Sequence, residues 1–397
     1  MPACFAVSSR IKLIPMTVLL LAGLTLLITR KDIRLSCRTA WPVVAVCALR
    51  LLYDIGNFLG HHLDWDTIGL PAQTLLFLAA AAVFALPLRD RVLAIGFSLT
   101  TLLLGLICLF QRYAQGVDRP AGLNGGDWAA VEFAMFVLLL VLLSMLQALR
   151  TSTHRSDRWL HIAAVVVGLY GAVLTQSRGP LLAFAPVYLG LMLWYAVRSH
   201  LWRRMLVLSG VTVVGMLAVT ATLHKEMVDR LAVVSTDISS YSTDDSPAAI
   251  AIRERLEMWR VAWQAFREHP LAGNGLEQFG PYVRHQVALG HADPAIAKYV
   301  HPHSEYLESM FAGGLPALLV LLLFLGVPLA YFARHANHSQ ESVAVSAVAG
   351  LMVIGIYALC AFSDNVFYRA MPQSLYLFLV LGLAVDIGRR LRHTPTR

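Results

Sequence analysis

The sequence predicts an all-α, polytopic helical membrane protein with about 11–12 transmembrane helices. Of its 397 residues, 57% are hydrophobic and only 14% are charged, whereas about a quarter of the residues of a soluble domain are charged. Apolar runs of about 18 or more residues recur, and each is long enough to cross a bilayer. A membrane β-barrel would need alternating strands of about ten residues, which the sequence lacks. Apart from closed barrels, only helices span a bilayer, because their backbone groups form hydrogen bonds within the same segment.

Eleven apolar runs qualify as membrane spans, and a twelfth short element near the N-terminus remains open. They are residues 11–29, 40–56, 71–88, 92–110, 129–149, 160–176, 179–197, 204–223, 308–333, 343–362 and 371–387.

The connecting loops alternate in charge, which predicts their sides of the membrane. Basic clusters follow the first span, recur in every second connection and end the chain at Arg389, Arg390 and Arg392, so these loops face the cytoplasm by the positive-inside rule. The intervening loops, above all the polar segment 224–303, then face outward. The chain divides into N-terminal spans at 1–223, a periplasmic loop at 224–303, and C-terminal spans with a basic tail at 304–397. The orientation of residues 1–10 stays open.

The charge and cysteine pattern excludes two other classes of protein. The net charge of +8 reports basic cytoplasmic loops, not a nucleic-acid-binding surface. The five cysteines are scattered, so they form neither a disulfide framework nor a cysteine metal motif.

The long polar segment contains an amphipathic helix at 247–268. Ser246 and Pro247 form a typical helix start. An apolar stripe follows, composed of Ile252, Leu256, Trp259, Trp263 and Phe266. Its two tryptophans suit a helix in the membrane interface or on top of the bundle. Arg255 lies at the edge of the stripe, where it can point towards the buried side.

His301 and His303 flank Pro302 where this segment ends. Proline favours a fresh helix start and keeps His301 extended. We expect His303 in the first turn of the next helix, where the positive end of the helix dipole favours a neutral imidazole that can act as a base. The alternative is an interfacial histidine that only caps a span.

Two short outer connections add charged candidates. Arg178 lies in an almost loopless turn, where a charge is costly unless it is paired or used; snorkelling towards headgroups is the alternative. Asp364 and Arg369 share another outer turn and are expected to pair with each other. Arg50 and Asp54, four residues apart, are also expected to form an ion pair.

A metal site has only weak candidates, Asp64 and Asp66, because short acidic pairs are common by chance. The sequence contains no Walker loop, dinucleotide-binding glycine motif or HExxH, so no metal and no cofactor are expected. The stronger candidates all lie on the outer side. Two arginines and a potential base suit an anionic, lipid-linked diphosphate.

Three motifs together resemble the bacterial O-antigen ligase and polymerase superfamily, in that family's order. They are TQSRG at 175–179, RLEMW at 255–259 with PLAGNG at 270–275, and HPHSEYLE at 301–308 followed by Gly314 and Leu315. The resemblance extends from about residue 129 to the C-terminal end. Ser304 departs from the asparagine that the family often has there.

The resemblance implies a C-type glycosyltransferase fold with an essential His303 and essential Arg178 and Arg255. His301, Glu305, Asp364 and Arg369 are expected to support this site. The implied activity is that of an O-antigen ligase in the bacterial inner membrane. It would transfer a glycan from undecaprenyl diphosphate to a sugar hydroxyl of lipid A–core, at the periplasmic face, with inversion and without a metal. The partners are then the lipid-linked O-antigen, lipid A–core and membrane lipids.

Other functions remain open at this point. An O-antigen polymerase or a protein O-oligosaccharyltransferase would use the same donor with a different acceptor. A membrane transporter would place its charges near mid-bilayer on broken helices in repeated halves, but here the charges gather at one face. A non-enzymatic scaffold would leave the arginines and the histidine unexplained.

Overall fold

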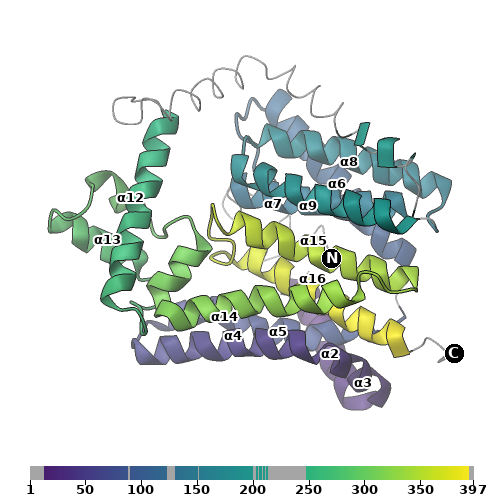
Figure 1. Cartoon of the computed structure of the whole chain (residues 1–397), viewed down its shortest axis with the longest axis horizontal. Coiled ribbons are helices and arrows are strands. Elements are labelled where there is room, and N and C mark those ends of the chain that lie inside the picture. The colour runs from purple at the N-terminus through teal and green to yellow at the C-terminus, as the bar shows by residue number, and fades with distance from the viewer. Residues whose placement is uncertain are drawn as a thin grey trace.

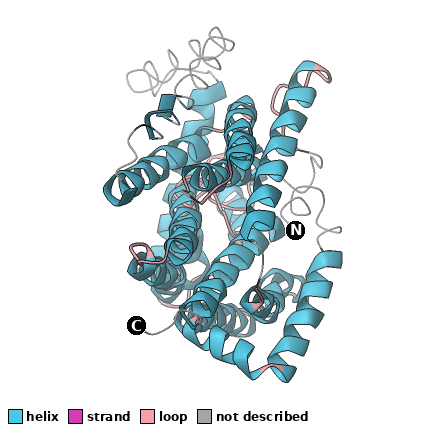
Figure 2. Cartoon of the chain, turned by 90° about the vertical axis from the view of Figure 1, so that its right-hand side faces the viewer, coloured by secondary structure: helices cyan, strands magenta, loops and turns pink. Residues whose placement is uncertain are grey.

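The computed structural model describes residues 13–87, 90–122, 130–150, 152–199, scattered positions from 203 to 212, and 247–392. These residues form helices and no strand (Figure 2). Nine of the described helices are long and apolar enough to cross a membrane, or ten if the bent pair at the N-terminal end counts as one span. The predicted class, an all-α polytopic membrane protein, is therefore confirmed. Most of the predicted span 204–223 lies outside the described residues.

The N-terminal helices α2 (Leu13–Thr29) and α3 (Lys31–Thr39) are bent by 107° relative to each other. The basic segment 30–38, predicted as a loop, is thus a helix. Its amphipathic sequence explains the difference, because Ile33 is buried at 2% exposure while the charged side chains face outward. The chain continues through α4 (Trp41–Gly60), η1 (Trp65–Ile68), α5 (Gly69–Ala80) and η2 (Ala81–Ala85).

A second group comprises α6 (Asp90–Tyr113), α7 (Ala130–Leu149), α8 (Arg155–Leu174) and α9 (Arg178–Ser199). In Figure 1 these helices lie above α14, α15 and α16. Helix α7 packs against α6, α8, α9 and α15, so 83% of its apolar window is buried.

The third group comprises α14 (Glu305–His335), α15 (Glu341–Cys360) and α16 (Ala370–Arg392). An aromatic cluster ties the start of α16 to its neighbours. The Tyr376 ring lies 4.9 Å from Phe324, 5.0 Å from Tyr357 and 5.1 Å from Phe367. The Tyr357 hydroxyl donates to the Pro372 carbonyl at 2.6 Å. This cluster anchors the turn between α15 and α16, which carries Asp364.

The described part of the polar segment, residues 247–303, forms α12 (Pro247–Glu268), α13 (Phe279–Ala288) and η3 (Pro294–Lys298) at one end of the bundle. Helix α12 runs across the direction of the long helices in Figure 1. Its residues 247–268 match the predicted helix, but the buried face is not the predicted stripe. Met258, Val261, Ala262 and Ala265 are buried, whereas Ile252, Leu256 and Trp263 are 36–49% exposed. Three members of the predicted stripe are therefore open on the surface of α12, whereas Trp259 and Phe266 are half-buried.

Helix α14, predicted as one continuous span, is broken at Gly313 and Gly314. Gly314 has φ 66° and ψ −156°, a conformation essentially restricted to glycine. A Cβ atom there would lie 2.4 Å from the Pro270 carbonyl oxygen. The segment 270–275 is hydrogen-bonded along this break, since Leu315 N donates to Pro270 O at 2.8 Å and Gly275 N donates to Ala312 O at 2.9 Å.

Helix α4 satisfies two further groups at the same break. The Tyr53 hydroxyl donates to Gly313 O at 2.8 Å, and Asn57 Nδ2 donates to Ala312 O at 2.9 Å. Irregular backbone at membrane depth is tolerated where protein groups satisfy it. The break thereby fixes the polar segment onto the bundle beside the start of α14.

Candidate functional site

His303 and Asp364 form a hydrogen-bonded pair at the end of the bundle that carries α12. His303 Nδ1 lies 3.0 Å from Asp364 Oδ1, and the side chains are 26% and 7% exposed. His303 precedes α14, and Asp364 lies in the turn between α15 and α16. Nδ1–H donates to the carboxylate, so Nε2 is left as the acceptor nitrogen. Nε2 makes no hydrogen bond to the described residues.

The backbone at His303 differs from the prediction. Helix α14 begins at Glu305, with Ser304 as an extended N-cap, so His303 is not in the first helical turn. Instead it has φ 52°, in the left-handed region. Non-glycine residues are uncommon there and often lie at functional sites. Trp259 Nε1 donates to the Pro302 carbonyl at 3.0 Å and holds the preceding residue. The carboxylate of Asp364, not the helix dipole, is the group that faces the ring.

The predicted pairing of Asp364 with Arg369 is wrong. Arg369 Nε lies 2.9 Å from Glu132 Oε1, at the start of α7. Asp364 Oδ1 accepts from His303 and from Asn365 N, the latter at 2.9 Å. Burial raises the pKa of Asp364, but the hydrogen bond and the charge of His303 outweigh this effect and hold the pKa below its ordinary value. Asp364 is therefore a carboxylate at neutral pH.

His301 lies directly against the pair. Its ring centroid is 4.4 Å from that of His303 and 4.7 Å from that of Tyr368. Burial, and next the charge of His303, lower the pKa of His301 to about 4. A neutral His301 does not compete for a proton, so it serves as a packing partner for the His303 ring.

Arg178 is the first residue of α9 and is exposed. A Cβ atom on the following Gly179 would lie 2.5 Å from Ser363 Oγ. The turn with Arg178 is thus pressed against the residue that precedes Asp364, and glycine permits this approach. No hydrogen bond joins Arg178 to another residue in the described part of the chain.

Arg255 lies on α12 and is half-buried. Trp259 lies one helical turn further on, and its bond to Pro302 holds this face of α12 beside the His303 segment. The adjacent Glu254 is occupied by Lys298 at 2.7 Å and by the Tyr299 hydroxyl. Arg255 makes no hydrogen bond to the residues that the structure describes, so its guanidinium can bind an anion.

Glu305 supports the pair through the backbone. Its carboxylate accepts from Phe367 N at 3.2 Å, and its own N–H donates to Ala361 O at 2.9 Å. These bonds fasten the start of α14 to the turn that bears Asp364. Sequence reasoning missed Glu132 and Asn365 in this region. A lone glutamate opening an otherwise apolar span was an available signal for Glu132, whereas nothing local marked Asn365.

One group of described residues has the spacing for a shared metal ion: His301, His303 and Asp364, whose ligand atoms lie within 4.8 Å of one another. The weak metal candidates Asp64 and Asp66, around η1, are not part of such a group among the described residues. The predicted Arg50–Asp54 ion pair is confirmed, with Nε to Oδ2 at 3.0 Å.

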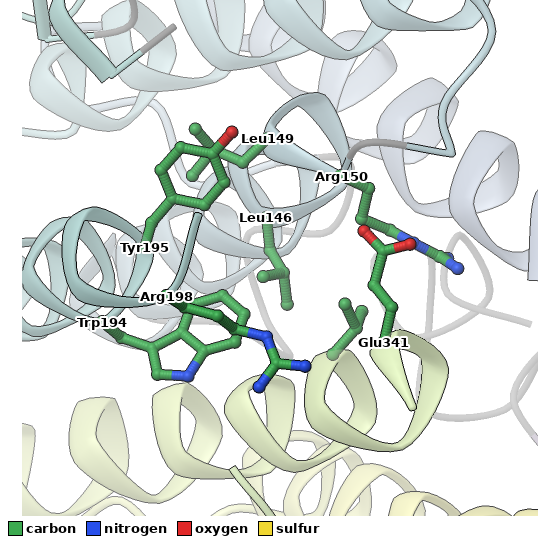
Figure 3. A pocket seen from close by; sticks show the side chains of 8 residues that line it. Leu146, Leu149, Arg150, Trp194, Tyr195, Arg198 and Glu341 are labelled. Carbon is green, nitrogen blue, oxygen red and sulfur yellow. The ribbon is translucent and has the colours of Figure 1, made fainter. Parts of the chain in front are cut away.

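A cavity of about 260 Å³ lies at the end of the bundle opposite to the His303–Asp364 pair (Figure 3). It is formed by the ends of α7 and α9 and the start of α15, and its lining includes Arg150, Trp194, Arg198 and Glu341. None of the predicted site residues lines it, so cavity size does not identify the site here.

Comparison with known proteins agrees with the motif pattern. Residues 163–322 match the O-antigen ligase family, a range that contains Arg178, Arg255 and His303. The chain is also similar to an uncharacterised protein of Haemophilus influenzae, 23% identical over 278 residues and covering 68% of each chain. Asp364 lies beyond the matched range and is joined to the site by tertiary structure.

Proposed function

Because the chain belongs to the O-antigen ligase superfamily, we propose that it is an O-antigen ligase. It transfers a glycan from undecaprenyl diphosphate to a sugar hydroxyl of lipid A–core. The observation that carries this proposal is the His303–Asp364 pair, at 3.0 Å. Among the described residues, neither His303 Nε2 nor the nearby arginines Arg178 and Arg255 have a hydrogen-bond partner.

The pair is suited to general-base catalysis. His303 Nε2 accepts the proton of the acceptor hydroxyl while the oxygen attacks the anomeric carbon. Asp364 holds the ring orientation through Nδ1–H and stabilises the imidazolium that forms, the role of a carboxylate beside a catalytic histidine. General-base catalysis contributes about 10²–10⁴-fold to the rate.

The arginines act on the leaving group. As the new glycosidic bond forms, the bond from the anomeric carbon to the diphosphate oxygen breaks, and undecaprenyl diphosphate departs with the electron pair. Arg178 and Arg255 bind its oxygens, because a planar guanidinium matches phosphate geometry. One displacement inverts the anomeric carbon. The donor bond supplies the energy and the arginines supply the countercharge, so the mechanism requires neither ATP nor a metal.

The distribution of charge supports a periplasmic site in the inner membrane. Arg150, Arg198, Arg334, Arg389 and Arg390 belong to the ends of α7, α9, α14 and α16 that are remote from His303. Under the positive-inside rule that end is cytoplasmic, and this supports a periplasmic position for the His303–Asp364 pair.

The proposal is tested by in vitro transfer with purified protein, lipid-linked donor and defined acceptors. His303→Ala should lower the rate by at least about 100-fold with unchanged folding. Arg178→Lys should retain little transfer activity, because lysine keeps the charge but loses the bidentate geometry of the guanidinium. Arg334→Lys, at the other end of the bundle, is the matched control.

Near-normal transfer by His303→Ala would contradict the assignment of His303 as the general base. Transfer to a second lipid-linked repeat, and not to lipid A–core, would indicate a polymerase. Loss of wild-type activity in EDTA would contradict the metal-independent mechanism.

A further inference from the structure

A separate cavity of about 70 Å³, lined by polar and apolar side chains, lies near the turn that carries Asp364. It lies between α4, the start of α14 and the turn 365–368, and the proposed mechanism does not use it. Its lining includes Asn365, next in sequence to Asp364, and Glu305, two residues after His303. Tyr368, whose ring contacts His301, also lines it. The cavity is therefore linked to the His303 ring through the rings of Tyr368 and His301.

The Asn365 side chain indicates that the cavity takes a polar ligand. It is only 2% exposed, yet neither Nδ2 nor Oδ1 has a hydrogen-bond partner among the described residues. Glu308 also lines the cavity, and its Oε2 is buried with no hydrogen-bond partner among those residues. Buried polar atoms without partners are costly, at about 1–3 kcal/mol each, so such atoms at a cavity wall point to a molecule that satisfies them.

The charge of the lining restricts the kind of ligand. Arg50 and Asp54 neutralise each other as an ion pair. The other lining carboxyl groups are Glu277, Glu305 and Glu308, and no second basic residue is part of the lining. The lining thus offers a phosphate no cation beyond the paired Arg50, whereas carboxyl and amide oxygens accept hydrogen bonds from hydroxyl groups.

We propose that this cavity binds the terminal sugar of the acceptor through its hydroxyl groups, and that it selects a sugar ring without phosphate. This inference rests on the proposed function. The donor diphosphate belongs with Arg178 and Arg255, because the lining of the cavity has no second cation to pair with it. The acceptor hydroxyl, by contrast, must come within hydrogen-bond distance of His303 Nε2. We place this sugar at Asn365 and Glu308, so that one of its hydroxyl groups extends to that nitrogen.

The test measures KM for donor and acceptor separately in the purified transfer reaction. Asn365→Ala should raise the acceptor KM about tenfold, the equivalent of one hydrogen bond to a buried group, with the donor KM unchanged. Its melting temperature without substrate should be equal or higher, because the substitution removes unsatisfied polar atoms.

Charge selection is tested with two acceptors that differ only in a phosphate on the terminal sugar. The wild type should prefer the phosphate-free acceptor. Glu277→Gln, at the exposed edge of the cavity, should reduce this preference several-fold. Asp64→Asn removes a nearby carboxylate that does not line the cavity, and the preference should persist in this control.

A rise in the donor KM with an unchanged acceptor KM would show that the cavity holds donor sugar and would overturn the inference. Unchanged constants in Asn365→Ala would show that water alone fills the cavity, with the same consequence. If the wild-type protein transferred glycan to no lipid-linked sugar, the proposed ligase function itself would fail, and this result is distinct from either pattern of KM.

Discussion

The substitution Asp364→Asn separates the charge of the His303–Asp364 pair from its geometry. The amide oxygen can still accept from His303 Nδ1 and Asn365 N, which now lie 3.0 Å and 2.9 Å from the carboxylate oxygen. The substitution therefore preserves the ring orientation and removes the negative charge that stabilises the imidazolium formed during transfer.

The size of the effect follows from the geometry. Two unit charges about 4 Å apart interact by about 4 kcal/mol at an effective dielectric constant of 20. The His303 side chain is 26% exposed, so solvent screening reduces this energy to about 2 kcal/mol. At 1.36 kcal/mol per factor of ten, kcat should fall about 30-fold.

The assay is single-turnover transfer from the lipid-linked donor, with the amount of folded protein normalised by size-exclusion chromatography. Asp386→Asn is the matched control. Asp386 is another buried carboxylate, 8% exposed and paired with Arg389 and Arg390 at the far end of the bundle. The substitution Asp386→Asn should lower the stability of the protein but leave the transfer rate per folded molecule unchanged. A rate for Asp364→Asn within threefold of wild type would refute the electrostatic role of Asp364.

Three further predictions concern the backbone and the buried histidine. Gly314→Ala should lower the free energy of unfolding by more than about 2 kcal/mol, because φ is 66° and a Cβ atom would meet Pro270 O at 2.4 Å. The control Gly326→Ala, in open space in the same helix, should leave the melting temperature nearly unchanged. The pKa of His301 is about 4 in the folded protein and about 6.5 unfolded. The free energy of unfolding should thus be highest above pH 6.5 and decline by about 3 kcal/mol as the pH falls to 4. Thermal melts of His301→Gln should lack that decline. An unchanged pH dependence in this variant would contradict the lowered pKa of His301. Gly179→Ala should slow transfer about three- to tenfold by displacing Arg178, because its Cβ would lie 2.5 Å from Ser363 Oγ. Adding Ser363→Ala should restore the rate. If the double variant stayed slow, the contact between Gly179 and Ser363 would not explain the effect.

Sequence reasoning recovered features that depend on composition and local spacing. Long apolar runs produced the spans, and a Ser-Pro start with helical periodicity produced α12 with bounds that agree with the structure. The Arg50–Asp54 pair was also predictable, because residues four apart share a helical face.

Errors arose where partners come from distant parts of the chain. Asp364 and Arg369 were expected to pair because they are near in sequence, yet each forms an ion pair with a residue on another element. The buried face of α12 was misassigned because Met258 and Ala262 pack against α13 and α14, while larger apolar residues remain open.

The sequence by itself determined that this is a membrane-spanning helical protein and that His303, Arg178 and Arg255 belong to recognisable motifs, because apolar length and motif spacing are local properties. Tertiary structure alone decided that Asp364 is the partner of His303, 61 residues away in the chain. It also decided that α14 breaks where residues 270–275 dock. Hydrogen bonds and packing across such separations depend on the folded arrangement of whole helices, which no short stretch of sequence encodes.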